Sequence, residues 1–453
     1  MPELTAPVAR PQETADAGDA PPTTDRRDAP RSTLAFLERL LASYQPRDFA
    51  VRLWDGTCWP SETAIVPRFT LVLRHPGALR SMLLRPGGPS SLSFGEAYIY
   101  DDVDIEGDVH AVFPVVEHVL AHSWTAAEQM KLAMQLLRLP APRRDRKGRQ
   151  AARLGGARHS RRRDHAAVTY HYDTSNDFYA VYLDEQMVYS CAYFASPNED
   201  LDSAQRRKLD YVCRKLRLRP GMRLLDIGCG WGALVRYAAR AYGVQTRGIT
   251  LSRPQAELAW ERIHAEGLDE QCTVEVADYR ELAEPDGYDA LVSVGMAEHV
   301  GEGRIGEYFA RAWRVLRPGG VFLNHAIAPN PTHREPRGQS FVDRYVFPDG
   351  ELLPISTTVR AAETNGFEVR DVESLREHYA LTLRHWVRRL ESNHAAAVAA
   401  TDETTYRVWR VYMAGSAQGF ESGRLNVYQT LLVKQDRGKS YMPLTRTDWY
   451  APS

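Results

Sequence analysis

The amino-acid sequence predicts an α/β protein, in which an open sheet covered by helices on both faces follows a smaller N-terminal α+β domain. Two observations predict the sheet. From about residue 166, short β-rich runs alternate with helical stretches, and a glycine-rich turn joins the first of these runs to a helix. A third observation is the composition: 43% hydrophobic and 25% charged residues over 453 positions are typical of a globular chain with more than one domain.

The first thirty residues are rich in Pro, Ala, Asp and Thr and lack the apolar run of a signal peptide. We therefore expect residues 1–30 to be disordered. No run of about 20 apolar residues occurs in the chain, so no membrane-spanning helix is predicted. The five cysteines form no CxxC pair, which argues against a disulfide framework or a metal site and favours a reducing, cytoplasmic location.

Residues 31–140 are predicted to form the small α+β domain. STLAFLERLLASY predicts a helix with Ser32 or Thr33 as its N-cap. FAVRLWDGTCW predicts a hairpin that turns at Asp55-Gly56. RFTLVLRHPGALRSMLL predicts a strand and then a short helix, and residues 109–138 are mostly helical by pattern.

Residues 141–165 form a basic linker, in which ten Lys or Arg stand against two Asp. One interpretation is a solvated, flexible connection. A second is a strap that meets anionic lipid headgroups, where each charge contributes about 1 kcal/mol. A third is a nucleic-acid patch. The formal net charge of the whole chain is −1, so it does not decide among the three.

Residues 166–435 are predicted to form the catalytic domain, and residues 436–453 a C-terminal tail. The β-rich runs are MRLLDIG, VQTRGITLS, CTVEVAD, YDALVSVG and GVFLNHAI. Residues 376–430 are predicted to be helical and carry many aromatic side chains. These helices are either core or a cover over the carboxyl edge of the sheet, where ligands bind in open α/β folds.

The stretch LLDIGCGWG indicates a nucleotide site, since it leads from a strand through three glycines into a helix. A dinucleotide fingerprint requires a later third glycine than Gly232 and an acid about 20 residues on, which ITLSRPQ lacks. Asp226 followed by Gly228 and Gly230 indicates an S-adenosylmethionine (SAM) loop instead. SAM has no phosphate, so an aspartate can hold its cationic amino-acid part. The fold class is then a class I SAM-methyltransferase (Rossmann-like) domain.

The segment ADYRE follows the third predicted strand, where an adenine contact belongs. Asp278 is expected to accept from the exocyclic amine and Tyr279 to pack on the ring. The alternative is a turn acid beside a core tyrosine.

Six segments occur in a single order: YHYDTSNDFYAVYLDEQMVYSCAYF, LDIGCGWG, ITLSRPQ, ADYR, VSVGMAEHVG and RYVFPDGELLP. Together they resemble the cyclopropane-fatty-acyl-phospholipid synthase family of SAM-dependent methyltransferases. The resemblance is dense over residues 166–430 and looser in the N-terminal domain, at FGEAYIYDDVDIEGD. Mycolic-acid cyclopropane synthases resemble only the catalytic part. The resemblance therefore implies a phospholipid acyl chain as substrate and a lipid-associated N-terminal domain.

The chemistry that the resemblance implies is methyl transfer from SAM to a cis double bond. The alkene becomes a carbocation, a base removes a proton from the new methyl group, and the ring closes. The implied base is a bound bicarbonate, and the residues that match its site are Cys191, Glu298, His325, Ile327 and Tyr379. A dry pocket with aromatic faces suits a carbocation.

Two of these residues admit more than one role. Cys191 could be a nucleophile, but we expect it to form one wall of the bicarbonate niche through its backbone N–H or a weak S–H contact. Glu298 and bicarbonate cannot face each other as two bare anions. We therefore expect Glu298 either to accept the bicarbonate proton or to orient His325 or Tyr379. His299 is expected to be structural.

For SAM, the resemblance implies contacts from residues of several segments. These are Tyr172, Tyr189, Ser190, Gly228, Gly230, Thr250, Gln255 and Asp278. Thr250 and Gln255 would take the ribose hydroxyls, which accounts for the missing acid. The resemblance also implies a homodimer, an unsaturated phospholipid in an anionic membrane surface as partner, and a cytoplasmic protein bound peripherally to the inner face of the membrane. No nucleic-acid partner is expected.

Three other functions remain open. The same carbocation can lose a different proton and leave a methylene- or methyl-branched chain. A lipid-binding module without catalysis would use the N-terminal domain and the basic linker. A small-molecule or nucleic-acid methyltransferase would also suit the basic linker. Neither of the last two requires the YSCAY, EHVG and NHAI segments together.

Overall fold

The computed structural model describes residues 29–62, 66–84, 89–121, 125–141, 146–172, 174–332 and 340–450. Two sheets organise these residues, one of four strands near the N-terminus and one of seven strands in the larger part. Apart from Ala29 and Pro30, which are helical, the predicted disordered segment lies outside the described residues.

The four-stranded sheet has the order β2-β1-β3-β4. Its strands are β1 (Ala50–Arg52), β2 (Cys58–Trp59), β3 (Phe69–Leu73) and β4 (Val103–Gly107). The predicted hairpin is confirmed, because β1 and β2 pair antiparallel and Gly56 takes a positive φ of 89° in the turn between them. The helices are α1 (Ala29–Leu40), α2 (Ala78–Leu83), α3 (Ser91–Ile99), η1 (Val109–Ala111), α4 (Val112–Ala121) and α5 (Ala126–Arg138).

The predicted N-cap of the first helix is wrong. Helix α1 already includes Ala29, so Ser32 and Thr33 lie inside it. Pro30 did not signal an earlier start because a proline outside a helix and a proline in its first turn look the same in a sequence.

The seven-stranded sheet has the order β10-β11-β9-β8-β5-β6-β7. Its strands are β5 (Arg223–Ile227), β6 (Gln245–Thr250), β7 (Cys272–Val276), β8 (Tyr288–Val294), β9 (Leu316–Pro329), β10 (Glu368–Ser374) and β11 (Leu425–Val433). Strands β5 to β9 run parallel to their neighbours, and β11 runs antiparallel between β9 and β10. The order reverses between β5 and β8, which creates a crevice at their carboxyl ends.

The helical prediction for residues 376–430 is wrong at its C-terminal end, since β11 begins at Leu425. The segment LNVYQTLLV is rich in β-branched and aliphatic residues, and most of it is buried. An interior strand of this kind lacks the alternation that would separate it from a buried helix.

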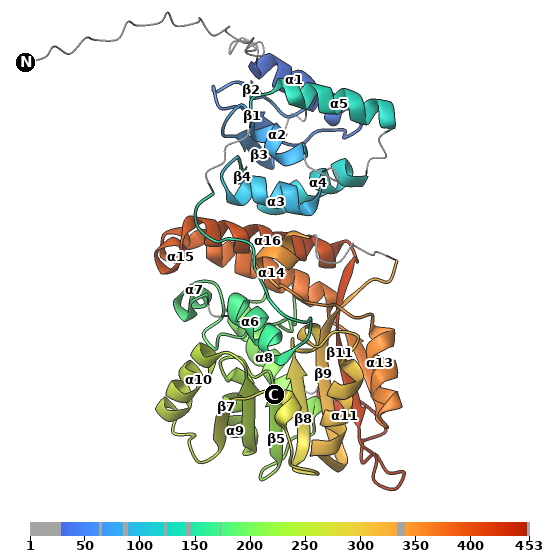
Figure 1. The fold of residues 1–453 in the computed structure, drawn as a ribbon. Coiled ribbons are helices and arrows are strands. Elements are labelled where there is room, and N and C mark those ends of the chain that lie inside the picture. The colour runs from blue at the N-terminus through green and yellow to red at the C-terminus, as the bar shows by residue number, and fades with distance from the viewer. Residues whose placement is uncertain are drawn as a thin grey trace, which may run out of the picture.

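Helices cover both faces and the carboxyl edge of this sheet (Figure 1). They are α6 (Arg161–Tyr172), α7 (Asn176–Ala180), α8 (Leu201–Lys215), α9 (Ala233–Tyr242), α10 (Arg253–Ala265), η2 (Tyr279–Glu281), η3 (Ala297–His299), α11 (Ile305–Val315), α12 (Phe341–Tyr345), α13 (Ile355–Thr364), α14 (Arg376–Ser392), α15 (His394–Ala400), α16 (Glu403–Glu421) and η4 (Thr447–Trp449).

The N-terminal part packs on α14 and α16, which separate it from the large sheet (Figure 1). Two glycines mark close approach: a Cβ on Gly415 of α16 would lie 2.8 Å from the Phe113 ring, and one on Gly95 of α3 would clash with the Phe341 ring. One hydrophobic cluster includes buried residues of both parts. The two parts therefore share a core.

The described portion of the basic linker makes hydrogen bonds to the rest of the protein. Arg163 donates to both carboxylate oxygens of Asp349. The Arg149 guanidinium donates to the Tyr345 and Tyr170 carbonyls at 3.0 Å and lies 4.6 Å from the Trp409 ring. The interpretation of this segment as a freely solvated connection is therefore wrong for these two arginines, while the lipid strap and the nucleic-acid patch stay predictions.

Of the helices that the structure describes, none is both long and apolar enough to cross a membrane.

Candidate active site

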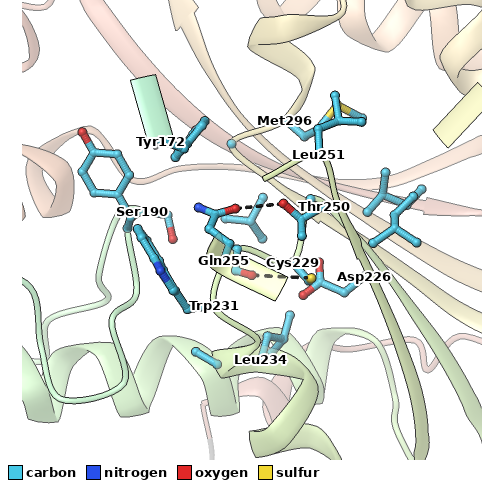
Figure 2. Close-up of a pocket in the computed structure, with 18 of the residues that line it drawn as sticks. Tyr172, Ser190, Asp226, Cys229, Trp231, Leu234, Thr250, Leu251, Gln255 and Met296 are labelled. Atoms are coloured by element: carbon cyan, nitrogen blue, oxygen red, sulfur yellow. Dashed lines mark hydrogen bonds between the residues drawn. The ribbon is translucent and has the colours of Figure 1, made fainter. Parts of the chain in front are cut away.

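A cavity opens at the carboxyl ends of β5, β6, β7 and β8, at the point where the strand order reverses. Figure 2 shows its walls, with Tyr172 and Met296 on one side and Leu234 on the other. All ten residues predicted to contact SAM line it: Tyr172, Tyr189, Ser190, Asp226, Gly228, Gly230, Thr250, Gln255, Asp278 and Tyr279. Segments that are far apart in the sequence thus meet at one cavity because parallel strands end at one edge.

The glycine-rich turn brings backbone to the cavity wall. Gly228, Gly230 and Gly232 all have positive φ, at 88°, 55° and 75°. A Cβ on Gly228 would lie 3.1 Å from Met296, whereas a Cβ on Gly230 would meet no described atom within 4 Å. Gly230 faces the open cavity, so the missing side chain leaves room for a ligand.

The Gly230→Ala substitution tests this role. A methyl group there would stand in the cavity, so we expect SAM affinity to fall by about 10-fold, the effect of about 1.4 kcal/mol. Gly267→Ala is the control, since Gly267 also has a positive φ, 66°, and no described atom near its Cβ position, yet it lies outside the cavity. Both variants should lose about 1–2 kcal/mol of stability. Calorimetric titration with SAM and thermal unfolding separate the effects, and equal affinity losses would contradict the role.

Thr250 and Gln255 form the predicted polar pair. The Thr250 hydroxyl donates to Gln255 Oε1 at 2.8 Å, as Figure 2 shows. Thr250 ends β6, and Gln255 lies in the first turn of α10, whose N-cap is Ser252. Both side chains are buried at the cavity wall, so their remaining donors and acceptors are available to ligand hydroxyls.

Asp278 also lies in the cavity wall, where it is paired with Arg280, a residue that was not predicted to belong to the site. Arg280 donates to Asp278 Oδ1 at 2.9 Å and to Oδ2 at 2.6 Å, and it also pairs with Asp164 at 3.0 Å. These bonds lower the pKa of the Asp278 carboxyl against the opposing effect of burial. A carboxylate has about four acceptor sites, so Asp278 can still accept from an exocyclic amine.

A buried lysine, which the sequence did not single out, joins two predicted SAM residues. Lys208 of α8 is 3% exposed, lines the cavity and donates to Ser190 Oγ at 2.9 Å. Burial lowers the pKa of Lys208 to about 8, although Asp184 and Asp226 oppose that shift. Burial raises the pKa of Asp226 to about 7, and Lys208 limits the rise. The cavity therefore presents an anion and a cation, which suits a zwitterionic amino-acid group.

The five residues predicted to hold bicarbonate do not line this cavity, although Cys191 and Glu298 are next in sequence to the lining residues Ser190 and His299. Glu298 connects these residues to the cavity in two ways. Its neighbour His299 lines the cavity. The pKa of Tyr172, another lining residue, is raised by burial and further by the charge of Glu298. Glu298 Oε1 accepts from the Ile327 N–H at 2.8 Å. Oε2 is buried and has no hydrogen-bond partner among the described residues. Burial raises the pKa of Glu298 to about 7.

His325 shows the same pattern. Its Nδ1 lies 3.2 Å from Gln429 Nε2, and its Nε2 is buried with no hydrogen-bond partner among the described residues. Burial lowers the pKa of His325 to about 3, with Lys208 and Lys215 adding to the shift, so the imidazole is neutral near pH 7. We define the bicarbonate niche as the buried space that Cys191, Glu298, His325, Ile327 and Tyr379 are predicted to enclose.

Cys191 and Tyr379 belong to the same buried neighbourhood. Cys191 Sγ contacts the Leu375 carbonyl at 3.7 Å, and Leu375 precedes the helix that carries Tyr379. Burial raises the pKa of the Tyr379 hydroxyl, and the nearby Tyr412 and Glu298 add to the rise. Burial also raises the pKa of the Cys191 thiol, which is fully buried. A neutral thiol fits a wall of the niche better than it fits a nucleophile.

Tyr189, which lines the cavity, and Tyr379 belong to a cluster of aromatic rings. Tyr189 stacks on His171 at 5.7 Å between centroids and lies 5.1 Å from the Trp386 ring. Tyr379 lies 6.2 Å from Trp386. Trp386 is one of the aromatic residues in the helical stretch that begins at residue 376, and it was not predicted as a site residue. His299, expected to be structural, lines the cavity with its Nε2 3.5 Å from the Tyr172 hydroxyl.

SAM fits these residues. Its sulfonium and ammonium groups require an anion, which Asp226 supplies, and its carboxylate requires donors, which Lys208 and Ser190 can supply. Its adenine and ribose require flat apolar contact and hydroxyl partners, which Tyr279, Thr250 and Gln255 can supply.

Comparison with known proteins also indicates a SAM-dependent methyltransferase that acts on lipid acyl chains. Residues 159–430, which include this cavity, match the family model described as mycolic acid cyclopropane synthetase. Residues 36–123 match a domain of unknown function. A protein of Pseudomonas putida named probable fatty acid methyltransferase is 39% identical over 404 residues, which cover 88% of this chain and 95% of that protein.

Two further similarities concern cyclopropane synthases. The cyclopropane-fatty-acyl-phospholipid synthase of Escherichia coli (strain K12) is 36% identical over 286 residues, 62% of this chain and 72% of that enzyme. The solved structure of the mycolic acid cyclopropane synthase CmaA1, complexed with SAH and CTAB, is 36% identical and has a TM-score of 0.56 over 59% of this chain and 97% of that one.

Proposed function

Because the chain belongs to the mycolic acid cyclopropane synthetase family of SAM-dependent methyltransferases, we propose that it converts the cis double bond of an unsaturated phospholipid acyl chain into a cyclopropane ring. One observation carries the proposal: Glu298, which lies between the cavity-lining residues Met296 and His299, and His325 each have a buried atom, Oε2 and Nε2, without a hydrogen-bond partner among the described residues. Buried polar atoms are normally paired, so two such atoms indicate a ligand.

A small anion of several oxygens fits the niche. His325 Nε2 can donate to an anion oxygen, and the Glu298 carboxylate can accept the proton of an anion that carries an O–H. Bicarbonate has both features. When bound, it would supply a base for the proton that the new methyl group loses. Glu298, His325 and Tyr379 would hold it.

The chain's own residues would protect the carbocation. The rings of Tyr189, Trp386 and Tyr379 lie close to one another, and the negative π face of such a ring attracts a positive charge. The Cys191 thiol is neutral and contacts backbone carbonyls, so it offers no thiolate for alkylation. Exclusion of water also prevents capture of the cation as an alcohol.

Branching of the same chain is the second candidate. A relative named fatty acid methyltransferase is similar over most of this chain, which favours a methyl- or methylene-branched product from the same cation. The resemblance favours cyclopropanation instead, because Glu298, His299 and His325 stand as they do in the cyclopropane-forming members of the family. A homodimer remains a prediction.

Expression in a bacterial host without cyclopropane lipids tests the two products. We expect its fatty acids to show a cyclopropane species by chromatography, with upfield ring protons in the proton NMR spectrum. Vinylidene protons would replace that proposal with branching. Unchanged fatty acids from a host that contains folded protein and cis-unsaturated phospholipid would contradict both.

We further propose that the bilayer meets helix α5 rather than the basic linker. Met130, Met134 and Leu137 follow each other at helical spacing and are 64%, 51% and 56% exposed. Lys131 lies beside this apolar stripe and is exposed, so the helix combines apolar insertion with attraction to anionic headgroups.

Serine substitution at Met130, Met134 and Leu137 together should lower binding to vesicles of anionic phospholipid by about 10-fold or more, since burying each side chain contributes about 1.5–3 kcal/mol at most. Leu444→Ser is the control, because Leu444 is also fully exposed but lies in the C-terminal segment. Co-sedimentation with vesicles measures the effect. Retained binding of the triple variant, with its SAM affinity intact, would remove α5 from the account.

A further inference from the structure

A buried chain of hydrogen bonds runs from the edge of the sheet to His325. It starts at Glu373 of β10, passes through Lys215 of α8 to Gln429 of β11, and ends at His325 of β9. Lys215 and Gln429 are both 0% exposed. Gln429 and His325 are direct partners in the antiparallel β9–β11 ladder, so the backbone fixes their side chains next to each other.

The lysine determines which way the Gln429 amide points. Lys215 Nζ lies 2.9 Å from Gln429 Oε1. An ammonium group has donors only, so the amide oxygen must face it. Glu373 and Asp371 compensate the ammonium charge, the first by a direct hydrogen bond and the second at 3.8 Å. The NH2 group of Gln429 must therefore face His325.

The amide in turn determines where the imidazole proton lies. Gln429 Nε2 donates toward His325 Nδ1 at 3.2 Å, so Nδ1 must be the unprotonated acceptor. In a neutral imidazole the single proton then lies on Nε2. Nε2 is the buried nitrogen that has no partner among the described residues, which makes it an N–H donor directed at the niche.

We propose that Lys215 and Gln429 are positioning residues, which hold His325 as the neutral tautomer protonated on Nε2 and thereby make it a hydrogen-bond donor, not a base, in the niche. The identity of the acceptor as bicarbonate rests on the proposed function. The tautomer does not, because it follows from Lys215, Gln429 and His325 alone.

The Gln429→Glu substitution replaces the NH2 donor that faces His325 with a carboxylate acceptor. A carboxylate still accepts from Lys215, but it also accepts from His325 and so draws the imidazole proton to Nδ1. We expect Nε2 to lose its proton at neutral pH and kcat to fall about 10- to 100-fold, the effect of one lost hydrogen bond to a charged group. The SAM affinity of the variant should stay within about two-fold of the wild-type value, since neither Gln429 nor His325 lines the SAM cavity. Thr430→Val is the matched control, because Thr430 is the next residue of β11, equally buried and on the opposite face.

Nitrogen-15 NMR of protein labelled in its 14 histidines gives the readout, with the His325 signals assigned by their loss in His325→Gln. The wild-type protein should show proton-coupled Nε2 and unprotonated Nδ1 at neutral pH, and Gln429→Glu should exchange the two. A wild-type spectrum with protonated Nδ1 would overturn the proposal even if the variant failed to fold. So would a folded Gln429→Glu protein with the wild-type tautomer. The expected tautomer in a protein that forms no cyclopropane would uphold the positioning role and contradict only the proposed function.

Discussion

Replacing Glu298 with glutamine is expected to lower kcat by at least about 100-fold while leaving SAM affinity within about two-fold. The new side chain would keep an oxygen for the Ile327 N–H, so the local fold should survive. It would place an NH2 group where Glu298 Oε2 now lies buried. An NH2 group is a hydrogen-bond donor only, so it cannot accept the hydrogen bond from the bicarbonate O–H. Steady-state turnover and calorimetric titration with SAM measure the two effects.

The pH dependence of kcat gives a second measure of the same carboxyl. Burial raises the pKa of Glu298 to about 7, so the proton-accepting carboxylate prevails above that pH and is lost below it. At saturating SAM and fixed bicarbonate, kcat should therefore fall as the pH drops through about 7. His325, with a pKa of about 3, stays neutral over this range.

Glu302→Gln is the control for this substitution, because Glu302 is a nearby glutamate that is exposed and lies outside the cavity and the niche. It should retain wild-type turnover. A Glu298→Gln protein with turnover near that of the wild type would remove Glu298 from the chemistry.

Replacing Asp226 with asparagine is expected to weaken SAM binding about 10- to 100-fold at pH 8, the effect of about 1.5–3 kcal/mol for a hydrogen bond or ion contact to a charged group. Asp226 is 3% exposed at the end of β5 and lines the cavity together with Lys208, whose charge limits the rise of the Asp226 pKa. Asparagine keeps the shape but removes the charge that attracts the cationic methionine part.

The affinity of the wild-type protein should also depend on pH. Burial raises the pKa of Asp226 to about 7 without ligand, and a bound cation would lower it, so SAM binding should release a proton below about pH 7. The dissociation constant should therefore rise as the pH falls from about 7 to 5.5, where Lys208, with a pKa of about 8, stays charged. The Asp226→Asn protein should lose this dependence.

Calorimetry in buffers of different ionisation enthalpy counts the released protons directly. Asp269→Asn is the control, since Asp269 is 57% exposed in its side chain and pairs with His264 at the surface. A wild-type affinity that is independent of pH, or a proton release that persists in Asp226→Asn, would contradict the role of Asp226.

Several residues of the cavity could be placed from the sequence because they lie at the ends of strands. Asp226, Thr250 and Asp278 follow or end β-rich runs, and parallel strands bring their carboxyl ends together without any further information. The resemblance to a known family added the remaining residues, and all ten line one cavity.

The sequence did not reveal the polar residues that support these contacts. Lys208 and Lys215 lie in an ordinary charged helix, where every lysine looks like a solvated one. Their burial depends on α8 packing against the sheet, and Gln429 lies in a strand that helical patterning concealed. Long-range packing, not local pattern, decides such sites. For the same reason, the charges of the basic linker gave no sign that Arg163 pairs with Asp349, 186 residues away.

The most direct measurement uses purified protein, vesicles of a cis-monounsaturated phospholipid, bicarbonate and SAM labelled with carbon-13 in its methyl group. The account predicts that the label appears in the lipid as an upfield cyclopropane methylene carbon, and that this signal is lost with Glu298→Gln. Label in a vinylidene or branched methyl carbon, or consumption of SAM without label in the lipid, would contradict the account.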